Sequence, residues 1–182
     1  MGQRGRILAE IFGFDGWFVK EAFFENAKGG RVVAVGRFDV LRETKLVLVF
    51  ERRWARRCGQ CTAPCRRLHE RGPMRRWSDL PWAGRSVEIA YAPARVKCAA
   101  CGSSPTEMVA WADPFQRQSR RLQQHLAVEA ASMPVSHVAA MHRLSWLTVR
   151  RAEEQAIPRW ELTRPITPLR QLGLDEQCLG RR

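Results

Sequence analysis

Two Cys-x-x-Cys pairs, Cys58–Cys61 and Cys98–Cys101, place the strongest constraint on what this chain can fold into. Two residues between thiolates let one tight turn present both sulfurs to a single ion. Two such turns facing each other complete a tetrahedron with metal–sulfur distances of about 2.3 Å. The ion then stabilises a small β-unit whose own core is too small to hold it together. We therefore predict a structural Zn²⁺ site formed by Cys58, Cys61, Cys98 and Cys101, with no open position for catalysis.

The spacing leaves alternatives open. The 36 residues between the pairs exceed the ~15–20 of a simple two-pair site, so the intervening hairpin must fold back. Cys65 and His69 offer a competing ligand set. Gly102 follows the second pair and can take the positive φ of a zinc-binding turn, whereas Thr62 follows the first. Buried small cysteines and a redox pair are the other interpretations, and Cys178 is expected to be a free thiol.

The charge distribution indicates a polyanionic partner. The chain has a formal net charge of +13, and residues 51–151 carry 18 Lys and Arg against 7 Asp and Glu, a net +11. Most of these residues are arginines, which bind phosphates and guanine edges with a forked geometry. A solubilising surface would not concentrate its charge in this way, so the pattern favours nucleic acid.

The chain shows no stretch approaching the ~18–20 apolar residues of a membrane span, and its first ten residues contain no signal-peptide run. We therefore expect a cytoplasmic, nucleoid-associated protein, in which reduced cysteines are more often metal ligands than disulfides. The expected partner is double-stranded DNA, which the chain could bind as a homodimer. We expect neither a membrane nor a small-molecule substrate.

The first 55 residues are predicted to be rich in β-strand. Arg31–Phe38 and Lys45–Phe50 contain β-branched and aliphatic runs. Trp17–Glu25 fits either a strand or a helix, and we assign it to a strand. The turn cluster Asn26–Gly30 could then join it to Arg31–Phe38 as a hairpin. Further on, Val87–Tyr91 alternates as a half-buried strand does.

From residue 116 the period changes to that of helices. We predict one helix between Ser119 and Ser132, a second at Val135–His142 and a third at Trp146–Ala156. Met133-Pro134 ends the first of these helices. Pro158, Pro165 and Pro168 mark an extended linker.

The second and third of these helices have the pattern of a helix-turn-helix. Small Ala139 would sit where two helices cross, Val149 would return to the core, and Arg143 would occupy the turn, where a left-handed conformation costs on the order of 1 kcal/mol. Ser145 can cap the third helix. The alternative is a plain helical hairpin in a core or a protein interface.

The outer face of the third helix and the basic start of the first are the candidate DNA contacts. For His125, His137 and His142 we expect packing or surface roles. The predicted DNA-binding residues are Ser145, Trp146, Thr148, Arg150, Arg151, Arg120 and Arg121.

The predicted fold class is therefore α+β. A β-rich segment (1–55) and a zinc-ribbon-like four-cysteine module (56–112) precede a helix-turn-helix three-helix unit (115–158). Residues 159–182 form a linker and the start of a further domain.

The order of these motifs resembles the N-terminal portion of the ISL3 family of insertion-sequence transposases, over roughly residues 5–176. The motifs that carry the resemblance are Cys58-x-x-Cys61, Arg66–His69, Asp79–Arg85, Arg95–Cys101, Leu144–Arg150 and Leu172–Glu176.

The resemblance implies zinc-binding and helix-turn-helix modules that recognise an element's terminal inverted repeats, followed by a ribonuclease-H-like domain with three catalytic acids. Leu172–Glu176 is similar to the first strand of that domain, which would make Asp175 a vestigial first acid. One carboxylate cannot hold the two ions that such chemistry needs. The resemblance therefore implies a truncated transposase that binds terminal repeats without catalysis. The alternatives are a zinc-containing transcriptional regulator, a nonspecific nucleic-acid chaperone and, least favoured, a complete enzyme.

Overall fold

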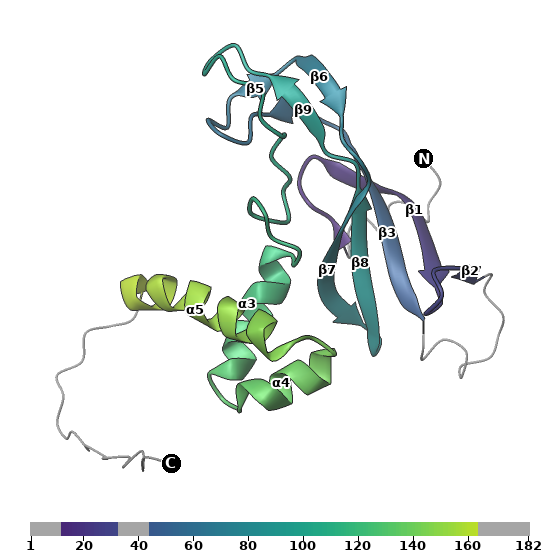
Figure 1. The fold of residues 1–182 in the computed structure, drawn as a ribbon, viewed down its shortest axis with the longest axis vertical. Helices are drawn as coiled ribbons and strands as arrows, with labels where there is room; N and C mark the ends of the chain where they lie inside the picture. Colours follow the sequence, from purple (N-terminus) through teal and green to yellow (C-terminus); the bar gives the residue numbers. More distant parts are fainter. Residues whose placement is uncertain (1–11, 33–43, 164–182) are drawn as a thin grey trace, which may run out of the picture.

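The computed structural model describes residues 12–32 and 44–163, and its largest element is a five-stranded mixed sheet (Figure 1). The strand order is β2-β1-β3-β8-β7. Neighbouring strands pair antiparallel except β3 and β8, which run parallel. The five strands are β1 (Trp17–Glu25), β2 (Arg31–Val32), β3 (Lys45–Arg52), β7 (Arg75–Trp82) and β8 (Arg85–Tyr91).

β3 lies at the centre of the sheet because its side chains are apolar on both faces. Leu46, Val47 and Leu48 are consecutive and all buried. A strand that is covered on both sides has a continuous aliphatic run of this kind. The strands predicted at Lys45–Phe50 and Trp17–Glu25 are confirmed.

The predicted turn after β1 is present, and it joins β1 to β2 in a hairpin. The side-chain oxygen of Asn26 accepts hydrogen bonds from the backbone N–H groups of Lys28 and Gly30, at 3.0 and 2.9 Å. Gly29 has a φ of +80°, a conformation that glycine adopts at no steric cost. Of the predicted strand Arg31–Phe38, the residues after Val32 lie outside the described part of the chain.

Strands from the two predicted N-terminal domains share this sheet. β8 comes from the predicted 56–112 module, yet it pairs with β3 of the predicted 1–55 segment, with Leu46 opposite Val87. The chain reverses between β7 and β8 at Ala83 and Gly84, whose φ angles are +50° and +73°. β7 therefore pairs antiparallel with β8 and forms the edge of the sheet. The hairpin between the two cysteine pairs therefore belongs to the main sheet.

A second lobe, residues 56–71 and 94–107, lies beyond one end of the sheet (the top of Figure 1). We call it the cysteine lobe. In it β4 (Arg56–Arg57) pairs with β5 (Pro64–Cys65), and β6 (Arg67–Arg71) pairs with β9 (Ala94–Lys97). The chain leaves the lobe after β6, forms the β7–β8 hairpin and returns through β9, which accounts for the long gap between the cysteine pairs.

The segment that follows the cysteine lobe packs Trp111 into the core of the sheet. Trp111 is 1% exposed. Each aromatic pair of this kind contributes about 0.5–1.5 kcal/mol beyond the burial of its area. The Trp111 side chain therefore anchors the connection between the lobe and the helices. Its ring centroid lies within 5.8 Å of those of Phe14, Trp17, Phe50, Trp77 and Tyr91.

Three helices complete the described fold: α3 (Arg120–Ala130), α4 (Val135–His142) and α5 (Trp146–Thr163). The helices predicted between Ser119 and Ser132 and at Val135–His142 are confirmed. They share a small core of their own, separate from that of the sheet. Its buried residues are Leu122, Leu126, Val138, Ala139, Val149 and Ala152.

The predicted end of the third helix at Ala156 is wrong, because α5 continues through Pro158 to Thr163. A proline lacks the N–H that would bond the carbonyl of Glu154, and it costs a helix interior about 3 kcal/mol. Both Pro158 and Glu154 are exposed, so water can replace the missing donor. Pro165 and Pro168 lie outside the described residues.

The mixed sheet and the separate helical unit confirm the predicted α+β class. No helix in residues 12–32 and 44–163 combines the length and apolar character needed to cross a membrane. The segment Leu172–Glu176, with Asp175, and the thiol of Cys178 lie outside the described residues.

Candidate metal centre and DNA-binding unit

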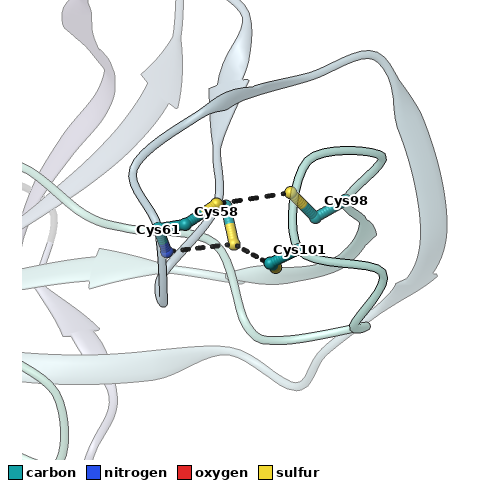
Figure 2. Close-up of side chains that lie close together, drawn as sticks. All are labelled: Cys58, Cys61, Cys98 and Cys101. Atoms are coloured by element: carbon teal, nitrogen blue, oxygen red, sulfur yellow. Dashed lines mark hydrogen bonds between the residues drawn. The ribbon is translucent and has the colours of Figure 1, made fainter.

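The four predicted cysteine ligands converge in the cysteine lobe (Figure 2). The sulfurs of Cys58 and Cys101 are 3.7 Å apart, and those of Cys61 and Cys98 are 3.5 Å apart. All four sulfurs lie within 4.8 Å of one another. A tetrahedral ion with metal–sulfur distances of about 2.3 Å requires sulfur–sulfur separations of about 3.8 Å. The set therefore has the dimensions of a closed four-thiolate metal site.

The two cysteine turns have the same backbone geometry. In the first, the N–H of Thr62 donates to the carbonyl of Cys58, and in the second, the N–H of Gly102 donates to the carbonyl of Cys98, both at 3.0 Å. Thr62 and Gly102 have φ angles of +61° and +70°. Thr62 thus adopts the left-handed conformation that glycine takes in the second turn, at a cost of about 1–2 kcal/mol for a residue with a Cβ.

The thiols differ in how readily they ionise, and the four clustered cysteines differ among themselves. Although the backbone of Ala63 favours the thiolate, hydrogen bonds with the sulfurs of Cys98 and Cys58 raise the pKa of Cys61 to about 12. Hydrogen bonding from the backbone N–H of Cys101 lowers the pKa of the Cys98 thiol to about 6. Burial raises the pKa of the Cys65 thiol to about 11. Metal ligands bind as thiolates. Cys65 is outside the group of four and His69 is exposed on β6, so the geometry favours the four cysteines over the competing Cys65–His69 set.

A buried glutamate joins the cysteine lobe to the sheet. The side chain of Glu107 is fully buried and pairs with Arg52 at 3.0 Å and Arg56 at 3.5 Å. It also accepts a hydrogen bond of 2.8 Å from the hydroxyl of Tyr91. Burial, together with the Glu107 charge, raises the pKa of Tyr91 to about 12. The tyrosine is therefore a neutral donor at physiological pH, and Glu107 forms a β-bridge with Cys58 of the first cysteine turn.

Gly59 allows this first turn to lie against the backbone of the lobe. A Cβ at Gly59 would lie 2.2 Å from the carbonyl oxygen of Thr106. We expect Gly59→Ala to destabilise the metal-bound fold by about 1–3 kcal/mol, because a strand or the turn must shift to admit the methyl group. Thermal unfolding of the metal-loaded protein measures the loss.

Gly102→Ala is the matched control, since nothing lies within 4 Å of its Cβ position and only its positive φ is affected. It should cost about 1 kcal/mol. Equal losses for the two variants would contradict the close approach at Gly59.

In the helical unit, α4 and α5 are joined by the short turn predicted from the sequence. Arg143 ends α4 in the left-handed conformation, with a φ of +55°. The N–H of Leu144 donates to the carbonyl of Ala139 at 2.9 Å, a hydrogen bond that satisfies an otherwise unpaired helix end. Ser145 caps α5 by accepting a hydrogen bond of 3.2 Å from the N–H of Thr148. The predicted roles of Arg143 in the turn and of Ser145 as the cap are therefore confirmed, and Ala139 is buried in the core that the helices share.

Residues 107–156, which contain α3, α4 and the first part of α5, match the family described as the helix-turn-helix domain of transposase family ISL3. The helical unit is an ISL3 helix-turn-helix. A curated relative supports the assignment: the transposase for insertion sequence element IS1001 from Bordetella parapertussis is 31% identical over 122 residues. The match covers 67% of this chain and 30% of that transposase, so the chain spans less than a third of the relative's length. No solved structure matches the chain significantly.

The ISL3 helix-turn-helix exposes the start of α5. Trp146 and Leu147 are 54% and 49% exposed, and Arg151 is also exposed. In the described part of the chain, no carboxylate forms an ion pair with Arg151. Arg150, by contrast, pairs with Glu153 at 2.6 Å and with Glu154 at 3.1 Å. Of the two predicted arginine contacts on α5, Arg151 is therefore the one with an uncompensated charge.

The two arginines that open α3 are paired with aspartates. Arg120 contacts Asp113 at 2.8 Å and also donates to the carbonyl of Ala110. Arg121 forms a two-pronged ion pair with the buried carboxylate of Asp79 on β7. These ion pairs join α3 to the preceding segment and to the sheet. The sequence, from which we predicted both arginines as DNA contacts, gave no indication of these intramolecular partners.

A cluster of histidines in the ISL3 helix-turn-helix was also missed. The side chains of His125 and His142 both contact the carboxylate of Glu129. His125 and Glu129 are four residues apart, which places them on one face of a helix. That spacing could have indicated the contact between His125 and Glu129. The contact of His142 with Glu129 could not be predicted, because it depends on how α4 packs against α3.

Proposed function

We propose that this chain binds a specific DNA duplex, the terminal inverted repeats of an insertion sequence, through α5 of its ISL3 helix-turn-helix. The observation that carries the proposal is the match of residues 107–156 to that transposase domain, combined with an exposed first part of α5 that carries the unpaired Arg151. In helix-turn-helix proteins the first residues of the second helix contact base edges in the major groove.

The exposed side chains of α5 suit this role. Arg151 can bind a guanine edge or a phosphate, and Trp146 and Leu147 offer apolar surface to thymine methyl groups. Ser145 and Thr148 bond to each other through their hydroxyl groups at 2.8 Å, so their first contribution is to fix the start of the helix. The N-terminal end of α5 also carries the positive end of the helix dipole, which favours phosphate.

We further propose that the cysteine lobe binds Zn²⁺. Four thiolates in a tetrahedral arrangement select Zn²⁺ or an iron–sulfur centre among the common biological metals, and a site closed by four cysteines is typical of structural zinc. The ion would order a lobe whose exposed surface is rich in basic residues that can contact the DNA backbone. These are Arg66, Arg67, Arg71, Arg95 and Lys97.

Arg151→Ala should weaken binding to the specific duplex by about 1–3 kcal/mol if the side chain contacts a base edge. Fluorescence anisotropy of the zinc-loaded full chain, with terminal-repeat and scrambled duplexes at one salt concentration, measures the change. Arg159→Ala is a suitable control because it removes the same charge two turns further along α5. An equal loss on both duplexes would instead assign Arg151 to a phosphate.

Comparison of terminal-repeat sequences with other duplexes separates the proposed function from regulation of transcription. A transposase-type module should prefer the terminal repeat. Tight binding to an unrelated operator with no preference for terminal repeats would contradict the proposal and favour a regulator.

A further inference from the structure

Three potential metal ligands meet where α3 and α4 end. The Nε2 of His142 lies 2.5 Å from one carboxylate oxygen of Glu129, and the Nε2 of His125 lies 3.2 Å from the other. The three ligand atoms are all within 4.8 Å of one another. The two imidazole rings stand nearly perpendicular, at 86°, with centroids 5.5 Å apart. Both nitrogens are thus directed at the same carboxylate from two helices.

The surroundings of this cluster favour a cation. Glu129 is the second-to-last residue of α3, and His142 is the last residue of α4. The C-terminal end of a helix carries a partial negative charge of about half an electron, and two such ends come together here. The side chain of His142 is 9% exposed and that of Glu129 is 19% exposed, so water screens the site only partly.

A network of hydrogen bonds alone is the simpler interpretation of the cluster. It requires both imidazoles to carry a proton on Nε2, so that each can donate to Glu129. A single divalent ion can replace these two protons and bind the same three atoms. A set of two imidazoles and one carboxylate is a common ligand set for transition metals.

We propose that His125, Glu129 and His142 form a second metal site, which takes a divalent transition-metal ion such as Zn²⁺. His125 and His142 would bind through Nε2, and Glu129 through a carboxylate oxygen. Three protein ligands leave at least one position for water, so this site is exchangeable, in contrast to the closed four-cysteine site. Binding displaces the protons from both Nε2 atoms, because imidazole coordinates through a deprotonated nitrogen.

An ion at this site would cross-link α3 to α4 one residue before the turn at Arg143. The cross-link would stabilise the packing of the helix-turn-helix by mass action. The proposal goes beyond DNA recognition, since the site involves none of the proposed contacts on α5. Metal stoichiometry tests it without any DNA.

The test adds Co²⁺ to the full chain after its four-cysteine site has been filled with Zn²⁺. The second site should take up one equivalent of Co²⁺ and give visible ligand-field bands without thiolate charge transfer, because its ligands are nitrogen and oxygen. His125→Ala should abolish this uptake. His125 is 43% exposed, so the substitution leaves the helical core intact, and the circular dichroism spectrum checks the fold.

His137→Ala is the matched control, since His137 is an exposed histidine on α4 outside the cluster. This variant should bind Co²⁺ as the unchanged protein does. Loss of Co²⁺ binding in His125→Ala but not in His137→Ala supports the site. The proposal is overturned if the zinc-loaded protein takes up no Co²⁺ at millimolar concentration, or if His125→Ala binds it equally well.

Discussion

Cys98→Ser should unfold the cysteine lobe and leave the five-stranded sheet folded. Three of the four buried residues in the core of the lobe are cysteines, namely Cys58, Cys65 and Cys98, and the fourth is Val96. A core of this size cannot offset the conformational entropy of the lobe without metal. Structural zinc sites supply roughly 10–16 kcal/mol of apparent binding free energy, and that energy is folding energy.

Hydrogen exchange measures this effect segment by segment. The amides of β6 and β9 should lose protection in Cys98→Ser, while those of β3 and β8 should keep it, because Leu48 and Ile89 pack in a core that contains no metal ligand. This is more local than unfolding of the whole predicted module 56–112, since β7 and β8 belong to the sheet.

Cys65→Ser provides the control for the loss of a cysteine. Cys65 is buried but lies outside the group of four ligands, so this variant should retain the metal and the protected amides of the lobe. Unchanged protection of β6 and β9 in Cys98→Ser would show that the lobe folds without its ion.

Asp79→Ala should have the second-largest effect, a loss of about 3–5 kcal/mol in the free energy of unfolding. The Asp79 side chain is fully buried, pairs with Arg121 and accepts a hydrogen bond of 2.6 Å from the hydroxyl of Ser119, the residue that caps α3. Removing the carboxylate leaves a partly buried guanidinium without its partner. It also removes the contact that joins the start of α3 to β7.

Chemical denaturation of the metal-loaded protein measures the loss. Asp113→Ala is the matched control, because Asp113 also pairs with an arginine at the start of α3 but is 42% exposed. A pair with this exposure contributes about 1 kcal/mol or less. Equal losses in the two variants would contradict the structural role assigned to Asp79.

The features that the sequence predicted are those encoded by neighbouring residues. Each cysteine turn is a local motif, and the turn at Arg143 follows from the spacing of Ala139, Ser145 and Val149. The hairpin after β1 likewise depends on Asn26 and the glycines beside it.

The features that could not be predicted depend on contacts between distant segments. The parallel pairing of Leu46 with Val87 and the burial of Trp111 among aromatic rings of the sheet have no local pattern. The same is true of the partner of Arg121, which looks like a DNA contact until Asp79 is placed beside it. Pro158 led to a wrong prediction of the end of α5 for a related reason. The free-energy cost of a proline in a helix depends on whether the carbonyl that it leaves unpaired is exposed to solvent.

The central claim is that α5, held on a metal-stabilised scaffold, distinguishes one duplex sequence from others. Selection of bound duplexes from a random pool by the zinc-loaded full chain, followed by competition with scrambled DNA at physiological salt, tests it most directly. The selected duplex should bind at least ~10³-fold more tightly than the scrambled one, and Arg151→Ala should reduce that ratio. Equal affinity for all duplexes would contradict the claim and would leave only a basic protein that binds phosphate.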